Sequence, residues 1–132
     1  MLLSSSVTCS VPASALVAAP FSLDWGDSVI AKVLAVNAYG ESLESVEGNG
    51  AVILTYPDAP IDVLEVVADR SKSSLGISWT APFAGGDTSL VYRINIREQG
   101  GTYSVLASGI SVTNYKAELL TAGVIYEFTV EA

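Results

Sequence analysis

The sequence predicts an all-β fold in which two antiparallel sheets pack face to face. Three segments, residues 75–79, 92–97 and 126–131, alternate apolar with polar residues, which is typical of strands with one buried and one solvated face. Turn-forming residues separate these segments, and no segment sustains the period of a helix. Of the 132 residues, 50% are hydrophobic and 15% are charged, so the chain is long and apolar enough for an ordered core.

The first part of the chain, residues 1–56, is expected to hold two strands and one helical turn. Residues 14–17 suffice for a single turn of helix. Residues 29–36 are expected to form a strand, and Ala51–Tyr56 the terminal strand of this part. Pro57-Asp58-Ala59-Pro60 follows, and prolines stop one strand and open an edge strand because they fix φ and have no N–H to donate. We therefore place a domain boundary between residues 56 and 57.

The second part, residues 57–132, is expected to be a series of strands. Ile61–Ala68 opens it, and the three alternating segments follow. Turn residues stand between the strands, at 82–87 with its Gly85-Gly86 pair, at Gln99-Gly100-Gly101 and at Thr121-Ala122-Gly123.

An internal repeat links the two parts. Leu23-Asp24-Trp25-Gly26 is followed by Val29, Val33 and Ala35, and Leu120-Thr121-Ala122-Gly123 is followed by Tyr126, Val130 and Ala132 at the same spacing. The offset is roughly the length of one β-sandwich domain, about 100 residues. The same structural unit therefore occurs twice, in a chain too short for two whole copies.

Four of these motifs together resemble tandem fibronectin type III modules. Pro57–Pro60 resembles the family's opening motif, and Ser78–Pro82 resembles its second strand with the core tryptophan. Leu120-x-x-Gly123-x-x-Tyr126 resembles the tyrosine corner, in which the phenol hydroxyl bonds to upstream backbone. Asn37–Ser42 resembles the loop after the sixth strand, in the first part of the chain.

The resemblance implies an immunoglobulin-like antiparallel β-sandwich. Residues 57–132 would form a module lacking its last strand, and residues 1–56 the C-terminal part of a preceding module. We expect six side chains of the second module in one core: Trp79, Tyr92, Ile94, Leu120, Tyr126 and Phe128.

Composition argues against catalysis and against nucleic acid as a partner. The net charge is −8, whereas nucleic-acid binding needs a basic face. The chain has no histidine and one cysteine, so His-dependent triads and an intrachain disulfide are excluded, and no cofactor or metal is expected. Cys9 is either a buried small hydrophobe or an intermolecular thiol. Glu127 and Glu131 face outward, with nothing to desolvate either carboxylate, so we predict no enzyme.

An apolar surface is expected in the first part. The outward face of residues 126–131 is Glu127, Thr129 and Glu131, but the corresponding first-part face is mostly apolar. Such strands are usually covered on both faces. We predict an interaction surface that consists of Ile30, Leu34, Val36, Val52 and Leu54. The alternative is that these are scattered surface apolar residues, which are normal in soluble proteins.

These expectations favour a non-enzymatic structural repeat unit of an extracellular fibre or cell-surface array. It would assemble by strand complementation and apolar packing with neighbouring copies of itself, or with adjacent modules of the same polypeptide, and no membrane span is expected. The alternative is an adhesion or ligand-binding module whose loops recognise a carbohydrate or a protein receptor. Tyr39, Tyr103 and Tyr115 are the aromatic candidates for that role.

Overall fold

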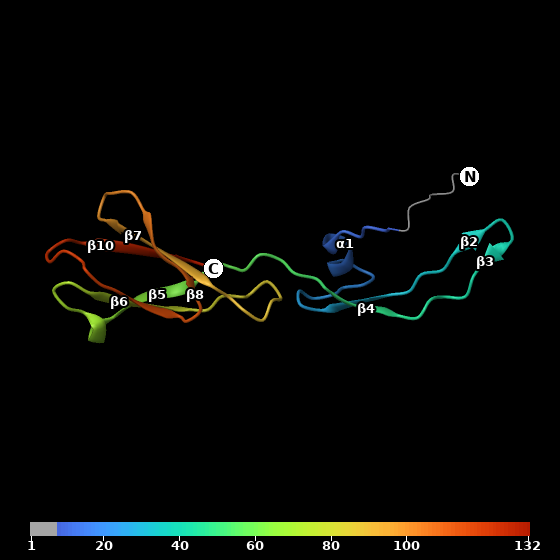
Figure 1. Ribbon diagram of the computed structural model, residues 1–132, viewed down its shortest axis with the longest axis horizontal. Helices are drawn as coiled ribbons and strands as arrows, with labels where there is room; N and C mark the ends of the chain where they lie inside the picture. The colour runs from blue at the N-terminus through green and yellow to red at the C-terminus, as the bar shows by residue number, and fades with distance from the viewer. Residues whose placement is uncertain (1–7) are drawn as a thin grey trace. The chain divides into compact units, whose positions relative to one another are not determined.

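The computed structural model describes residues 8–132, which contain ten strands, one short α-helix and one 3-10 turn (Figure 1). The chain divides into two compact units, one that ends at Thr55 and one that runs from Tyr56 to Ala132. Each unit is described by itself below.

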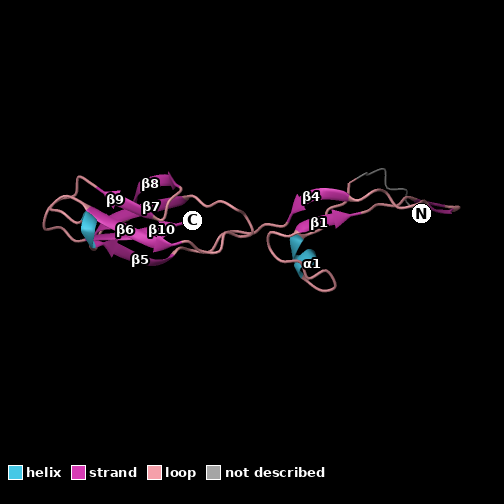
Figure 2. Cartoon of the chain, turned by 90° about the horizontal axis from the view of Figure 1, so that it is seen from below, coloured by secondary structure: helices cyan, strands magenta, loops and turns pink. Residues whose placement is uncertain are grey.

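The first unit is built on a long two-stranded ribbon. The helical turn α1 (Ala13–Val17) precedes β1 (Ser28–Ala31), which pairs antiparallel with β4 (Gly48–Val52) (Figure 2). Between them, β2 (Val36–Asn37) and β3 (Gly40–Glu41) form the hairpin at the far end of the ribbon.

The single strand expected over residues 29–36 is wrong, because two serines interrupt its ladder. The backbone N–H of Ser42 donates to the carbonyl of Ala35, but the N–H of Ala35 donates to the Ser42 hydroxyl instead of to a carbonyl. In the same way, the backbone N–H of Ser45 donates to the carbonyl of Val33, and the N–H of Val33 donates to the Ser45 hydroxyl. The side-chain bonds replace ladder bonds, so β1 and β2 are separate strands joined by an extended stretch. The terminal strand also differs from the one expected: it starts at Gly48 and ends at Val52.

The second unit consists of two three-stranded antiparallel sheets. One sheet has the order β5-β6-β9, and the other has the order β10-β7-β8 (Figure 2). The 3-10 turn η1 (Val67–Asp69) follows β5. The strand bounds are β5 Ile61–Val66, β6 Leu75–Thr80, β7 Tyr92–Glu98, β8 Ser104–Ile110, β9 Asn114–Ala117 and β10 Tyr126–Glu131. This is the immunoglobulin-like sandwich that the sequence predicts.

The buried core of the second unit gathers inward residues of both sheets. Its members are Ile77, Trp79, Tyr92, Ile94 and Val130. The rings of Trp79 and Tyr92 meet edge to face, with centroids 5.2 Å apart and planes at 71°. Alternation along the strands places these side chains on the inner faces, where apolar burial stabilises the sandwich.

The six side chains expected in the core do not all lie there. Trp79, Tyr92 and Ile94 are buried, and Phe128 packs against the cluster at its margin. Leu120 and Tyr126 are half-buried and lie outside the cluster. Leu120 lies in the segment before β10, and Tyr126 begins β10 and lines a groove beside it. The Tyr126 hydroxyl accepts the backbone N–H of Thr121 at 3.1 Å, which is the contact expected of a tyrosine corner.

Candidate assembly surfaces

The turns that lead into β1 and β10 are structural counterparts. In turn 24–27 the last N–H donates to the first carbonyl at 3.0 Å, and in turn 121–124 it does so at 3.4 Å. The third residue of each turn is a glycine with positive φ, Gly26 at 101° and Gly123 at 82°. Only glycine adopts this conformation readily. The repeat in the sequence therefore corresponds to a repeated backbone conformation.

The two counterparts differ in what lies beside them. In the first unit the Gly26 N–H donates to the carbonyl of Ile53 at 2.8 Å, and the Ile53 N–H donates to the carbonyl of Asp27 at 3.2 Å. In the second unit β10 pairs with β7 along one edge, and no strand of the described chain lies along the other. The equivalent groups, the N–H of Gly123 and the carbonyl of Val124, have no hydrogen-bond partner within residues 8–132. Within residues 8–132, β10 is therefore an edge strand of its sheet.

An apolar groove of about 420 Å³ lies beside this edge. It runs between the two sheets, where the edge strands β5 and β10 border it, and its apolar lining includes Val63, Leu64, Ile77, Val124, Ile125 and Phe128. The sequence did not predict it, since the lining comes from segments some 60 residues apart. In a sandwich, such a space is filled by inward side chains of a further strand.

An ion pair borders the groove. Two nitrogens of Arg70 donate to the two carboxylate oxygens of Glu65, at 2.6 Å and 2.5 Å. The hydrogen bonds from Arg70 hold the pKa of Glu65 below its usual value, and those to Glu65 raise the pKa of Arg70. Both side chains are substantially solvated, so the pair adds little stability. Its main effect is to leave no net charge at this rim.

The outward face of β10 is a polar ladder. Glu127 pairs with Arg97, and Glu131 accepts from Arg93 at 2.5 Å. Arg97 also lies over the ring of Tyr103, with its guanidinium carbon 4.4 Å from the ring centre. The bond from Arg93 holds the pKa of Glu131 low. A general acid at neutral pH needs a raised pKa, and the pKa of Glu131 is shifted in the opposite direction.

All five apolar residues expected at an interface are exposed in the first unit. Their exposed fractions run from 41% for Leu34 to 63% for Ile30. Val52 lies opposite Ser28 near one end of the ribbon, and Val36 begins the hairpin at the other. At about 3.3 Å per residue, positions 28 and 36 are roughly 26 Å apart. Ile30, Leu34, Val36, Val52 and Leu54 therefore form a line along the ribbon and not one compact patch.

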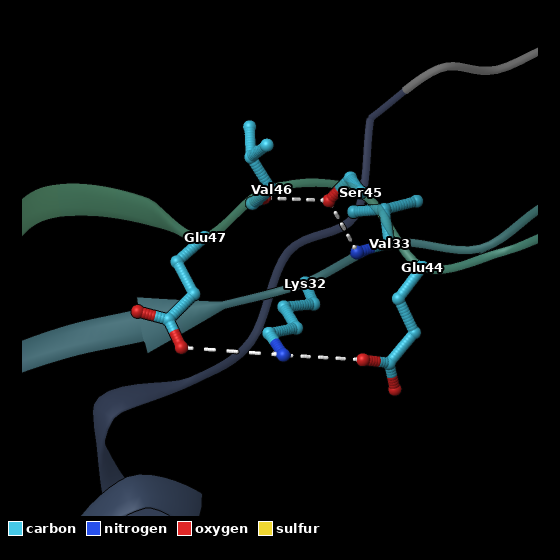
Figure 3. A network of polar contacts seen from close by, with 6 residues as sticks. All are labelled: Lys32, Val33, Glu44, Ser45, Val46 and Glu47. Carbon is cyan, nitrogen blue, oxygen red and sulfur yellow. Dashed lines mark hydrogen bonds and ion pairs between the residues drawn. The ribbon is translucent and has the colours of Figure 1, made fainter.

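A three-residue pattern organises the returning arm of the ribbon, and sequence reasoning missed it. Ser42-Leu43-Glu44 is followed by Ser45-Val46-Glu47, with the same residue types in the same order. Each serine hydroxyl accepts a ladder N–H and donates to the next carbonyl. Lys32 lies between the two glutamates, 3.2 Å from Glu44 and 4.0 Å from Glu47 (Figure 3). The apolar members, Leu43 and Val46, are 94% and 90% exposed.

The remaining sequence expectations concern Cys9, metal sites and membrane-spanning helices. Cys9 is exposed and its thiol is free, so the expectation that it is a buried small hydrophobe is wrong. Among residues 8–132, no three acidic, cysteine or histidine side chains come together as a metal site. No helix in the same part of the chain is long and apolar enough to cross a membrane.

Comparison with known proteins places this geometry in a family. The family model of the fibronectin type III domain matches residues 59–132. A crystal structure of domains A168-A170 from titin is similar, with a TM-score of 0.59 and 22% identity over 82% of this chain. A crystal structure of chicken CNTN1 FN1-FN3 domains covers 83%, with a TM-score of 0.41 and 20% identity. This chain spans 36% of the length of each of those chains. Through the match over residues 59–132, the chain belongs to the fibronectin type III domain family.

Proposed function

We propose that this chain is a non-enzymatic structural repeat unit of an extracellular fibre or cell-surface array, joined to its neighbours by strand complementation and apolar packing. The edge of β10 that has no partner strand within residues 8–132, together with the apolar groove beside it, carries the proposal. An unpaired edge presents main-chain donors and acceptors to which another strand adds readily. The neighbour is a second copy or an adjacent module of the same polypeptide.

The ribbon of the first unit supports the proposal from the opposite side of the contact. A two-stranded ribbon is marginally stable alone, and Ile53 is the one buried hydrophobic side chain among the described residues of this unit. Covering the exposed apolar line would stabilise the ribbon by roughly 25 cal/mol per Å² buried. Covering the ribbon and filling the groove would therefore both stabilise the protein by burying apolar surface.

Such a contact joins unlike surfaces. A heterologous contact that repeats produces an open filament, or a ring where the rotation closes. Sedimentation velocity at increasing concentration, followed by negative-stain imaging, tests this. We expect species larger than the monomer that grow with concentration. A monomer whose melting temperature does not depend on concentration would refute the proposal.

The apolar line is tested by a double variant, Leu34→Asp with Val36→Asp, which we expect to abolish assembly. The matched control is Thr102→Asp with Ser111→Asp, which adds the same charge at exposed loop positions of the second unit. The control should assemble as the original chain does. Particles of unchanged length from the Leu34/Val36 variant would show that this line takes no part.

The extracellular placement has its own test. Cys9 is exposed, so a membrane-impermeant maleimide should label it on intact cells after mild reduction. Labelling only after cell lysis would contradict the extracellular part of the proposal and leave the assembly part standing.

A second candidate function, ligand recognition, rests on Tyr39. This side chain is fully exposed at the tip of the β2–β3 hairpin, where the Asn37 side chain accepts its backbone N–H at 2.8 Å. Tyr103 is instead engaged by Arg97, and Tyr115 packs against the core. A glycan array probed with the original chain and with Tyr39→Ala tests this function. A signal lost on Tyr39→Ala would support ligand recognition, and no signal for either chain would oppose it.

A further inference from the structure

We infer that β8 carries a built-in barrier that keeps it from pairing with β8 of a second copy, and that Gly109 holds this barrier in place. The barrier is a pair of β-bulges. The inference goes beyond the proposed function, because it concerns the edge of the sheet that lies away from β10.

β8 is an edge strand formed by an internal segment of the chain. In the sheet order β10-β7-β8 it pairs with β7 along one edge, and no strand of residues 8–132 lies along its outer edge (Figure 2). The next strand along the chain, β9, belongs to the other sheet. An exposed strand edge presents unpaired N–H and C=O groups, which form a template for pairing with another chain.

β8 lacks the residue types that usually protect such an edge. Charged side chains and prolines on an edge strand oppose pairing. Residues 99–115 contain no charged residue and no proline. The edge strands of the other sheet differ, because β5 contains Asp62 and Glu65 and β9 contains Lys116. The composition of β8 would therefore leave its outer edge free to pair, and Val105 in it is 58% exposed.

The first bulge of β8 contains Gly109. Tyr92 of β7 lies opposite Ile110. Two residues further along β7, Ile94 lies opposite Ala107, which is three residues from Ile110 on β8, so β8 has one extra residue between these pairs. Gly109 has a φ of 69°, in the left-handed region that glycine adopts readily. Nothing lies within 4 Å of the point where its Cβ would stand, so the backbone conformation and not a lack of space favours glycine here.

The second bulge lies at Leu106. Ile94 lies opposite Ala107, and the next residue of β7, Asn95, lies opposite Val105, so Leu106 is the extra residue. Side-chain packing agrees with this register, because Leu106 and Ala107 are consecutive and yet both pack against the core cluster. In a regular strand, consecutive side chains point to opposite faces.

The bulges put the outer edge of β8 out of phase with a second strand. An antiparallel strand pairs through N–H and C=O groups that recur along one edge at every second residue. Each extra residue shifts this alternation and increases the local twist. A second copy of β8 carries the same two shifts, so the two edges match only over a short stretch.

Hydrogen exchange of the β8 amides in the full chain tests the barrier directly. The amides of residues 104–110 that face away from β7 should exchange at the same rate at low and at high protein concentration, because no second strand covers them. Slower exchange at high concentration would show that β8 pairs with another copy in the original chain, and would overturn the inference.

Removing the first bulge should make the edge pair. Deletion of Gly109 leaves Ala107 and Ile110 two residues apart, as in a regular strand, and removes no side chain from the core. We expect the outward amides of this variant to exchange about tenfold or more slowly at high concentration than at low. Gly109→Val is a second variant that keeps the chain length, since valine does not readily adopt this φ and the bulge must rearrange. A variant with the far-UV circular dichroism of the original chain and with concentration-independent exchange would overturn the inference.

A lysine on the freed edge provides the control. Val105→Lys, added to the Gly109 deletion, places a charge on β8 and should restore exchange that does not depend on concentration. The matched variant is Val67→Lys, because Val67 is 65% exposed and follows β5, in the sheet that does not contain β8. It should leave the slow exchange unchanged. Equal effects of the two lysines would show that the deletion variant associates through another surface, and would overturn the inference.

Discussion

Replacing Trp79 by alanine would remove an indole from the middle of the second unit's core. Trp79 is 5% exposed, packs with Ile77, Ile94 and Val130, and meets the Tyr92 ring edge to face. Its indole N–H is buried without a hydrogen-bond partner, so the substitution loses packing and no hydrogen bond. Large-to-small changes of core aromatics cost about 3–5 kcal/mol, of which an aromatic pair accounts for about 0.5–1.5 kcal/mol. We therefore expect Trp79→Ala to lower the free energy of unfolding by an amount in the upper part of this 3–5 kcal/mol range, about 4–5 kcal/mol.

Urea unfolding followed by far-UV circular dichroism measures this loss, because tryptophan fluorescence would change with the substitution itself. Phe83→Ala is the control, since Phe83 is a half-exposed aromatic of the same unit and should change stability by less than about 0.5 kcal/mol. Trp79→Phe keeps a ring against Tyr92 and removes the unbonded N–H, so it should lose less than Trp79→Ala. A loss below about 1 kcal/mol for Trp79→Ala would refute the assignment of this side chain to the core.

Three further predictions concern single contacts. Tyr126→Phe should lose about 1 kcal/mol in urea unfolding, through the tyrosine-corner hydrogen bond, and an unchanged midpoint would show that this bond adds nothing. Gly76→Ala should cost about 1–3 kcal/mol, because its new Cβ would lie 2.6 Å from the Cβ of Asp69, and a neutral result would mean that the turn after β5 moves freely. The hydrogen bond from Arg93 lowers the pKa of Glu131 in the folded state below its ordinary value of 4.5. As pH falls, Glu131 of the unfolded chain therefore takes up its proton first. The stability that this carboxylate contributes above pH 4.5 is lost as pH falls through its folded-state pKa. Melting temperatures from pH 7 to pH 3 should therefore fall less steeply for Glu131→Gln than for the original chain, and parallel curves would contradict the assignment.

Alternation was sufficient to predict the central strands of the second unit. β6 and β7 bury alternate apolar side chains, Ile77 and Trp79 in β6 and Tyr92 and Ile94 in β7, and β10 keeps the same alternation although only Val130 in it is fully buried. β8 and β9 were not predicted, because their residues are mostly exposed or half-buried and carry a weak pattern. Their strand conformation is decided by pairing with β7 and β6, which are distant in the sequence.

The first unit shows a different limit. The pattern over residues 29–36 correctly marks extended backbone, but local sequence does not indicate that the hydroxyls of Ser42 and Ser45 will replace carbonyls as acceptors. Which acceptor each N–H bonds to depends on which residues of the two arms lie opposite each other. This register is set only when the arms pair, so neither arm's sequence indicates it alone. The line of exposed apolar residues was predicted residue by residue, whereas its spread along the ribbon follows from the same register.

The sequence alone predicts that a turn followed by a strand occurs twice, since matched turn and strand residues recur at a fixed offset, and the structure has this turn before β1 and before β10. The difference between the two turns at one edge becomes visible only after folding. Ile53 bonds to this edge beside β1, while beside β10 the corresponding donor and acceptor have no partner among residues 8–132, and an apolar groove lies there. A groove is made by side chains from β5, β6 and β10 that meet only after the sheets have packed, and so it leaves no local pattern in the sequence.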